Sequence, residues 1–295
     1  MKIGTTEIHD TFAEAFRMRY ARVVITAHDD YWIDSAASEF SGYASSIISC
    51  DAEAGIERRL SRAETLDGRA GVAVLAFGFS SDRLAKAVTN RCGQCLMTCA
   101  TSAVFDGLPD SETRIPLGRH VRYFGDGFQK SKVVDTRRLW RVPVMDGEFV
   151  VEDQIGCEKG IAGGNLILQA RSLESALYAA RRAVDSIAEL PGVITPFPGG
   201  VVRSGSKVGS RYSALRASTN EAFCPSVRSR VETELHPNAH CAYEIVINGI
   251  SELTVAGAMG VAIRAAAGPD VLAISAGNYG GNLGKFHFHL REVVS

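Results

Sequence analysis

Two stretches in the second half of the sequence repeat one order of elements, and this repeat constrains the fold most. In the first, G-G-N-L-I-L-Q-A at 163–170 precedes a helical segment beginning near Ser172, then Pro-Gly and V-I-T-P-F-P-G-G. In the second, Y-E-I-V-I-N-G precedes a helical segment beginning near Ser251, then Gly-Pro and V-L-A-I-S-A-G-N-Y-G-G. Strand, helix and second strand at nearly equal spacing indicate split β-α-β units.

The first half carries strand and helix patterns as well. Short apolar runs predict buried strands, and polar starts followed by apolar residues at helical spacing predict helices. The strands are expected at 22–27, 45–50 and 71–79, and the helices at 29–40 and 80–91. A capping pattern from Asp10 to Glu14, followed by Phe16 and Tyr20, predicts another helix over 12–20.

Residues 109–120 are mostly polar, which predicts a surface loop. Around Trp140 the sequence becomes extended in character. R-V-P-V-M-D-G-E-F-V-V-E-D contains an Asp146-Gly147 turn signal between two extended runs, so we expect a β-hairpin there. The hairpin is also the candidate junction between two lobes, residues 1–146 and 147–295. The predicted fold class is α+β, with each lobe a mostly antiparallel, ferredoxin-like sheet flanked by helices.

Composition excludes several classes of protein. The 295 residues are 46% hydrophobic and 22% charged, and the net charge of −1 argues against a nucleic-acid-binding protein. The N-terminus lacks the apolar segment of a signal peptide, and the longest apolar run, 71–79, is too short to cross a bilayer. We therefore expect a cytoplasmic protein that does not bind a membrane.

Seven cysteines, an odd number, fit a reducing compartment better than a set of disulfides. Cys92, Cys95 and Cys99 are clustered, but a structural zinc site needs a fourth ligand, usually from a second paired motif. The remaining Cys157, Cys224 and Cys241 stand alone. We expect structural or incidental cysteines and no metal.

Glycine is concentrated in three segments, 160–165, 196–210 and 276–285. The last ends in Gly284-Lys285 but lacks the Ser or Thr that follows the lysine of a phosphate-binding P-loop. These glycines either serve turns between strands or let a flat ligand approach the backbone. In the second case, hydrogen bonds and a charge would come from Asn165, Ser206, Lys207 and Asn278.

Glu244 stands inside an apolar stretch, C-A-Y-E-I-V-I-N-G-I, that reads as a strand. Alternation places Ile245 and Ile247 on the core face and Glu244 with Ala242 on the other face. Either the carboxylate is solvated or paired with an arginine, or it is partly buried with a raised pKa. In the second case it is a candidate general acid and base.

Three arginine clusters, at 17–22, 58–62 and 137–141, interrupt the otherwise neutral chain. They are either ordinary surface and interface charge or a docking strip for a polyanionic ligand tail. No nucleophile motif such as G-x-S-x-G and no H-E-x-x-H metal motif occurs. Of the reaction types considered, the sequence leaves acid–base catalysis without a metal or a tightly bound cofactor.

Motifs spread along the chain together resemble those of the formylmethanofuran–tetrahydromethanopterin formyltransferase family. They include D-T-F-A-E-A-F, G-Q-C-L-M-T, F-G-D-G-F, G-I-A-G-G-N, P-F-P-G-G, S-K-V-G-S, S-T-N-E-A-F-C-P, Y-E-I-V-I-N-G and I-S-A-G-N-Y-G-G-N-L-G. The match is collinear from Asp10 to the C-terminus. The resemblance implies two-lobed subunits assembled as homodimers or homotetramers.

The resemblance further implies reversible formyl transfer between the amine of methanofuran or methylofuran and N5 of tetrahydromethanopterin, the two carrier substrates. It implies that Glu244 is the active-site glutamate. The carriers are then expected to contact the glycine segments and the neighbourhood of Glu244, with Asn165, Ser206, Lys207, Tyr243 and Asn278 as binding residues. The arginine clusters would suit the acidic tails of the carriers.

Family members from methanogens are strongly acidic, whereas this chain is nearly neutral, which resembles the type found in methylotrophic bacteria. That resemblance implies one-carbon metabolism in the direction of formaldehyde oxidation to formate, within a formyltransferase/hydrolase complex. A non-catalytic scaffold subunit of the hydrolase is the main alternative. A ferredoxin-like nucleic-acid binder is a further one, and it would bind RNA in a salt-dependent way.

Overall fold

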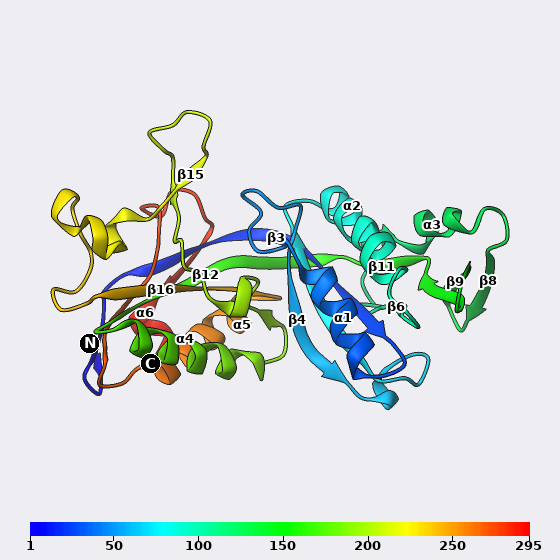
Figure 1. Cartoon of the computed structure of the whole chain (residues 1–295), viewed down its shortest axis with the longest axis horizontal. Coiled ribbons are helices and arrows are strands. Elements are labelled where there is room, and N and C mark those ends of the chain that lie inside the picture. Colours follow the sequence, from blue (N-terminus) through cyan, green and yellow to red (C-terminus); the bar gives the residue numbers. More distant parts are fainter. The chain divides into compact units, whose positions relative to one another are not determined.

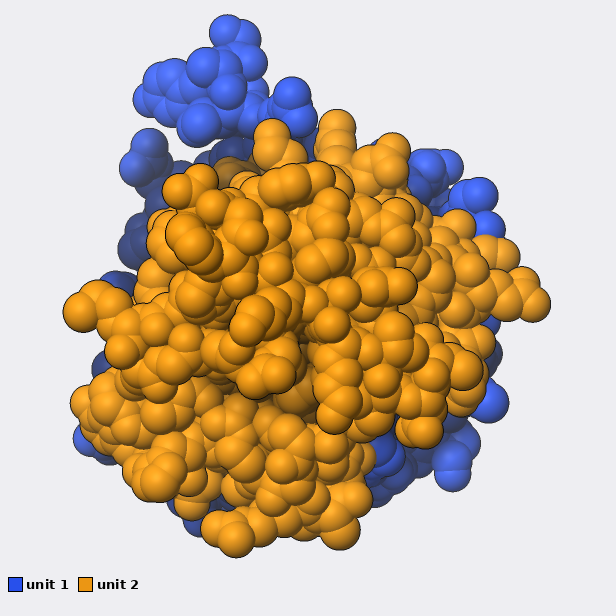
Figure 2. Space-filling view, turned by 90° about the vertical axis from the view of Figure 1, so that its right-hand side faces the viewer, with its two compact units in different colours: residues 1–17, 161–295 blue, residues 18–160 orange.

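The computed structural model describes all residues, Met1–Ser295, and they form two compact units. Unit 1 consists of residues 1–17 and 161–295, and unit 2 of residues 18–160; Figure 2 colours them blue and orange. The chain passes from one unit to the other within the long strands β3 (Phe12–Thr26) and β12 (Glu158–Ala170). The Asp146-Gly147 hairpin forms as predicted but lies inside unit 2, so it does not separate the compact units. The division into lobes at 146/147 stays a prediction.

Unit 1 contains the predicted repeat as a β-α-β-β-α-β fold (Figure 1). Its elements in chain order are β12, α4 (Leu173–Ala188), β13 (Val193–Ile194), β16 (Cys241–Gly249), α5 (Glu252–Ala266) and β17 (Val271–Ser275). The strands are antiparallel neighbours in the order β17-β12-β16-β13. Each helix therefore connects two strands that have a third between them, which is the ferredoxin-like arrangement predicted from the sequence.

The two helices of unit 1 cover one face of this sheet. Ala183 of α4 and Val255 of α5 belong to the same buried cluster as Leu166, Ile245 and Ile247 of the strands. Because side chains alternate along a strand, the residues between these point to the other face. That face of β12 and β16 carries a second, smaller apolar cluster, in which Ile167 packs with Phe223, Leu235, Ala239 and Leu272.

Unit 2 repeats the same order of elements. Following β3 are α1 (Asp30–Ser41), β4 (Glu53–Leu60), β5 (Gly71–Gly78), α2 (Ser81–Arg91) and β6 (Ala103–Asp106). The strand order is β4-β5-β3-β6, and β10 (Gly147–Glu152), β9 (Arg137–Val144) and β8 (Lys130–Val134) extend the sheet beyond β6. The strands predicted at 22–27 and 71–79 and the helices at 29–40 and 80–91 are therefore confirmed.

Shorter elements complete both units. In unit 1 they are β1 (Lys2–Ile3), β2 (Thr6–Ile8), β18 (Phe286–His289), α6 (Leu290–Val293) and a small hairpin of β14 (Lys207–Val208) with β15 (Ala217–Ser218). In unit 2 they are β7 (Arg114–Pro116), α3 (Gly118–Val121) and β11 (Gln154–Gly156). The predicted loop at 109–120 thus contains a short strand and a helical turn. No helix is both long and apolar enough to span a membrane.

The helix predicted over 12–20 is wrong, because this segment is the first part of β3. Residues 12–15 pair with β18, and residues from Arg19 onward pair with β5. The apolar residues that suggested a helix, Phe12, Phe16 and Tyr20, are four positions apart, and that spacing also keeps them on one face of a strand. The segment forms a strand and not a helix because it pairs with β18 and β5, which are distant in the sequence.

The extended segment predicted at 45–50 is also wrong. It forms a turn in which the Cys50 N–H donates to the Ser46 carbonyl at 2.8 Å. The Ile47 N–H donates to the Glu53 carboxylate at 2.9 Å. The two isoleucines at 47 and 48 therefore lie in a connection between α1 and β4 and not in a strand.

An ion pair between Arg137 of β9 and Glu152 of β10 links the two strands that extend the unit 2 sheet. The Arg137 guanidinium donates twice to Glu152, from Nε at 2.8 Å and from an Nη at 2.5 Å. Glu152, which is 3% exposed, also accepts from the Asp106 N–H at 2.8 Å. Glu152 is buried and the Arg137 side chain is 22% exposed, so loss of one partner should cost more stability than in a fully exposed ion pair.

We expect Glu152→Gln to lower the free energy of unfolding by about 2 kcal/mol, because it leaves the partly buried Arg137 guanidinium without its carboxylate partner. Urea denaturation followed by circular dichroism measures this. The matched control is Glu148→Gln, which removes the partner of Arg141 in a solvent-exposed ion pair and should change stability by less than about 1 kcal/mol. Equal effects of the two substitutions would contradict the prediction.

Candidate active site

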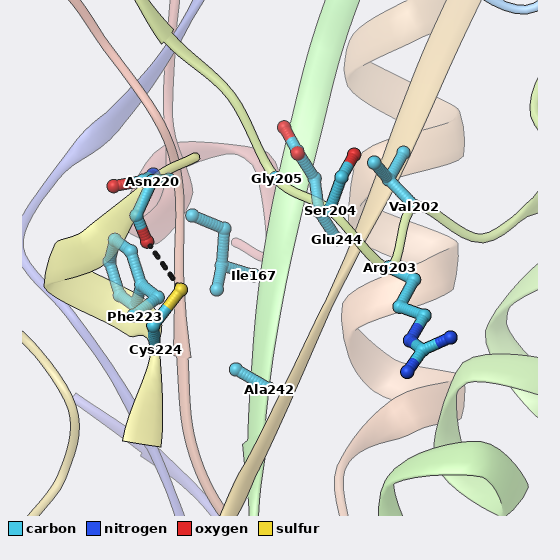
Figure 3. Close-up of a pocket in the computed structure, with 10 residues that line it drawn as sticks. All are labelled: Ile167, Val202, Arg203, Ser204, Gly205, Asn220, Phe223, Cys224, Ala242 and Glu244. Carbon is cyan, nitrogen blue, oxygen red and sulfur yellow. Dashed lines mark hydrogen bonds between the residues drawn. The ribbon is translucent and has the colours of Figure 1, made fainter. Parts of the chain in front are cut away.

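Glu244 lies in the middle of β16, on the sheet face opposite the helices. Its backbone exchanges two hydrogen bonds with Val202, of 2.7 and 3.1 Å, and Ile167 of β12 is its direct cross-strand neighbour. A pocket of about 40 Å³ opens beside it (Figure 3). The pocket is lined by Ile167, Val202, Arg203, Ser204, Gly205, Asn220, Phe223, Cys224, Ala242 and Glu244. All of these residues belong to unit 1.

The environment of the Glu244 carboxyl favours its neutral form. Burial raises the pKa of Glu244 from 4.5 to about 7. The arginine of the pocket lining, Arg203, points its guanidinium away from the carboxylate in Figure 3. Glu244 is therefore neither on an open sheet face nor paired with an arginine. At neutral pH such a carboxyl is present in both protonation states, so it is able to accept a proton and to return it.

The glycine-rich segment 276–285 wraps around a second carboxylate, Glu14 of β3. Glu14 is 1% exposed and accepts hydrogen bonds from four backbone N–H groups of this segment. They come from Tyr279 at 2.7 Å, Gly281 at 2.9 Å, and Leu283 and Gly284 at 2.5 Å each. Burial acts to raise the pKa of Glu14, but the four backbone hydrogen bonds outweigh it and lower the pKa. Glu14 and Glu244 thus have opposite electrostatic environments.

Tyr279 connects this segment to Glu244. The pKa of Tyr279 is raised by burial and, next, by the negative charges of Glu244 and Glu14, while a hydrogen bond with Ser206 acts in the opposite direction. The phenol therefore stays protonated at neutral pH, close to both Glu244 and Ser206. The structure thus brings together Glu244 and Ser206, which the sequence predicted, and Tyr279, which it did not.

Two other predicted binding residues hold the same glycine segment in place. Asn165 donates to the Gly277 carbonyl at 3.0 Å and accepts from the Gly277 N–H at 2.6 Å. Asn278 donates to the Thr11 hydroxyl at 3.2 Å and to the Phe12 carbonyl at 3.3 Å. Both amides are thus engaged within the chain, and their contact with a carrier stays a prediction.

The remaining two predicted binding residues lie away from the pocket lining. Lys207 forms an ion pair with Glu221. Tyr243, next to Glu244 on β16, has the opposite side-chain direction because neighbouring residues of a strand point to opposite faces. Neither residue lines the pocket beside Glu244, and carrier contacts of both stay predictions.

Sequence reasoning missed several residues that line the pocket. Ser204 and Gly205 precede the predicted Ser206, and Asn220 and Cys224 lie within the quoted motif S-T-N-E-A-F-C-P. The only sequence signals were the glycine-rich segment 196–210 for Ser204 and Gly205 and the family motif for Asn220 and Cys224. The segment 203–240 consists largely of turns, which no periodicity reveals. Glu14 was misread as part of a helix cap.

The cysteines and arginines largely serve the structure. All seven cysteines are free, and no cluster of three metal-ligating side chains occurs. Cys92 is packed in the core of unit 2, where burial raises the pKa of its thiol. Within the arginine clusters, Arg22 pairs with Glu57, and Arg137 with Glu152. These two guanidinium groups already have carboxylate partners inside unit 2.

Two family models match the chain almost end to end. One, described as formylmethanofuran-tetrahydromethanopterin formyltransferase, matches residues 1–144, and the other, the proximal lobe of the same enzyme, matches residues 147–293. The chain belongs to the formylmethanofuran–tetrahydromethanopterin formyltransferase family. The resemblance drawn from the sequence motifs is thereby confirmed.

Relatives with this formyltransferase name match over their full length. The chain is 50% identical to that of Methylococcus capsulatus over 299 residues, covering 100% of both chains. The Methanosarcina barkeri enzyme structure superimposes with a TM-score of 0.94 at 48% identity, over 99% of this chain and 100% of that one. A chain of the formyltransferase/hydrolase complex of Methylorubrum extorquens, solved with methylofuran, gives a TM-score of 0.96 at 43% identity, over 100% and 99%. The fold is therefore that of the formyltransferase family.

The raised pKa of Glu244 predicts how the stability of this formyltransferase depends on pH. Below pH 4.5 the carboxyl is protonated in both the folded and the unfolded chain, and its burial costs little. As pH rises toward 7 the unfolded chain loses the proton first, so stability falls. Above pH 7 the buried charge costs up to about 3 kcal/mol.

We therefore expect Glu244→Gln to raise the free energy of unfolding relative to the native chain above pH 7 and to change it little below pH 4.5. Urea denaturation at a series of pH values measures the difference. Glu232→Gln, at an exposed glutamate of the same unit, is the control and should show no such trend. A constant difference across the pH range for Glu244→Gln would contradict the assigned environment.

Proposed function

We propose that Glu244 moves the proton in the formyl transfer between a methanofuran-type amine and N5 of a tetrahydromethanopterin-type carrier. The observation that supports it is a carboxyl buried in a pocket, without an ion-pair partner, whose pKa lies near 7. Membership of the formyltransferase family supplies the reaction. A carboxyl poised near neutral pH suits a reaction that needs one proton removed and the same proton delivered.

The chemistry balances with one shuttling proton. N5 of the pterin attacks the formyl carbon of the formamide and forms a tetrahedral intermediate with negative charge on oxygen. Glu244, as the carboxylate, takes the proton from N5 and then, as the acid, gives it to the nitrogen of the furan carrier. The bond between this nitrogen and the formyl carbon breaks, which leaves the formyl group on N5 and the furan carrier as an amine. The reverse reaction uses the same steps in the opposite order.

Donors near Glu244 are proposed to stabilise the oxyanion of the intermediate. Ser206 and Tyr279 carry hydroxyls in this region, hydrogen-bonded to one another. Asn165 is a weaker candidate than the sequence suggested, since both its amide groups bond to Gly277. Asn278 holds β3, and Lys207 pairs with Glu221, so direct contacts from these two require a change of partner.

The cellular setting is also part of the proposal. The relatives in methylotrophic bacteria and the complex from Methylorubrum extorquens support formyl transfer in the direction of formate, with hydrolase subunits as partners. Free cysteines at all seven positions support the cytoplasm. Native mass spectrometry of the purified chain, alone and with hydrolase subunits, distinguishes a homodimer, a homotetramer and a mixed complex. A chain that stays monomeric with its hydrolase partners present would contradict the assembly.

We expect Glu244→Gln to lower kcat for formyl transfer by a factor of about 100 to 10,000, because glutamine neither accepts nor returns the proton. The initial rate of 5-formyl-tetrahydromethanopterin formation from formylmethanofuran measures it. In the native chain, kcat should rise with pH around a midpoint near 7, the pKa of Glu244. The control, Glu232→Gln, should behave as the native chain.

The alternative function is a scaffold subunit without catalysis, and the same variant decides between them. Unchanged turnover in a folded Glu244→Gln protein would rule out the proton shuttle. If the native chain also lacked transfer activity while it bound hydrolase subunits, the scaffold role would be supported. The partly buried, unpaired carboxyl of Glu244 favours catalysis, because its desolvation destabilises the fold at neutral pH and a scaffold has no need of it.

A further inference from the structure

Glu14 is a buried carboxylate that the proposed chemistry does not use. Each of its oxygens accepts two backbone N–H groups: Oε2 those of Tyr279 and Gly281, and Oε1 those of Leu283 and Gly284. Backbone N–H groups that converge in this way form a concave anion site. Here the anion is a side chain of the same molecule, so the site is filled internally and its effect is to fix the shape of the segment 279–284.

The glycines of the segment permit this wrapping. Gly280 and Gly281 have φ values of +70° and +75°, a region that residues with a side chain rarely adopt. A Cβ at Gly284 would lie 2.5 Å from the Ala15 carbonyl oxygen. These three glycines are therefore needed for the backbone to reach Glu14, which accounts for them without any ligand.

The same strand that carries Glu14 also holds the ring of Tyr279. Phe16, two positions along β3 and so on the same face as Glu14, packs against Tyr279 with ring centroids 6.2 Å apart. The backbone of Tyr279 is fixed by Glu14 and its hydroxyl by the hydrogen bond with Ser206. Three contacts thus determine where the phenol stands, and it stands close enough to Glu244 to feel its charge.

We propose that Glu14 is a positioning residue of the formyltransferase site, which holds the segment 279–284 so that Tyr279 stays hydrogen-bonded to Ser206 and near Glu244, in the geometry that formyl transfer needs. This inference rests on the proposed role of Glu244. Glu14 does not touch the reacting atoms and acts through Tyr279. In this proposal the glycine-rich segment 279–284 forms part of the active site and is more than a connection between strands.

Few charged or titratable groups share the surroundings of Glu244. The pocket lining contributes Arg203 and Cys224, and Tyr279 approaches from the glycine segment, with Glu14 behind it. Since the burial of Glu244 raises its pKa, we expect a displaced Tyr279 to give water more access to the carboxyl. The pKa of Glu244 should then fall toward the value of a solvated glutamate.

The principal variant is Glu14→Gln. Glutamine keeps the shape but replaces one acceptor oxygen with an NH₂ group that faces two N–H donors, so half of the anion site is lost. We expect kcat to fall about 10- to 100-fold because of the misplaced segment. We also expect the midpoint of the kcat–pH profile to move down by about one pH unit, with KM for the carriers changed much less.

The matched control is Glu152→Gln, which removes a carboxylate of similar burial from a backbone N–H and an arginine in unit 2. It should lower the melting temperature without altering the pH profile. Glu14→Asp, which keeps the charge, should restore the pH midpoint in part. If Glu14→Gln lowers stability as Glu152→Gln does but leaves kcat and the pH midpoint unchanged, the inference is wrong and Glu14 is purely structural.

A double-mutant cycle with Tyr279→Phe tests whether Glu14 acts through the phenol. If it does, the double variant should be no slower than the slower single variant; if the residues act independently, their fold-changes should multiply. Multiplying effects would overturn the inference. Glu244→Gln, assayed in parallel, separates the two proposals: if it retains full activity the proton shuttle fails, whereas if it is inactive and Glu14→Gln is normal only the positioning role fails.

Discussion

The antiparallel ladder between β12 and β16 is the interaction on which the site depends. It sets Ile167 opposite Glu244 and, one residue on, Leu168 opposite Tyr243. A shift of one residue in this register would turn Glu244 into the cluster beneath the helices and place Ile245 in the pocket. The register is strongly specified, because Leu166, Ile245 and Ile247 are all buried against α4 and α5. The apolar packing of one face therefore fixes the position of a carboxyl on the other.

The second face of the sheet explains why that carboxyl is desolvated. The chain does not leave this face to solvent: Val202 bonds to the Glu244 backbone, and Phe223 and Leu235 pack against Ile167 nearby. These segments exclude water, and their one arginine in the pocket lining, Arg203, points away from the carboxyl (Figure 3), so burial raises the pKa. An arginine paired with Glu244 would have favoured the carboxylate and lowered the pKa instead. The absence of a partner is thus as important to the proposed chemistry as the burial.

The sequence predicted the fold better than the site, and particular residues show why. Ser172 and Ser251 cap α4 and α5 where expected, and alternation placed Ile245 and Ile247 in the core, because these signals are local. The spacing of Phe12, Phe16 and Tyr20 led to the wrong prediction of a helix, since a spacing of four residues fits both a helix and one face of a strand. Only pairing with β18 and β5 decides between them. The same error concealed Glu14, whose partners lie more than 260 residues away along the chain.

Two glutamates of unit 1, the buried Glu14 and the partly buried Glu244, show how one fold assigns different tasks to the same side chain. Glu14 accepts hydrogen bonds from four N–H donors, so it remains an anion and holds the backbone of the segment 279–284 in place. Glu244 meets none, so it keeps a proton that it is able to exchange near neutral pH. Environments that push two pKa values apart are how sites separate acid–base roles from structural ones. Tyr279 links the two, with its N–H on Glu14 and its ring near Glu244. Glu14, which remains charged, thereby stabilises the segment 279–284 beside Glu244, the carboxyl proposed to exchange the proton.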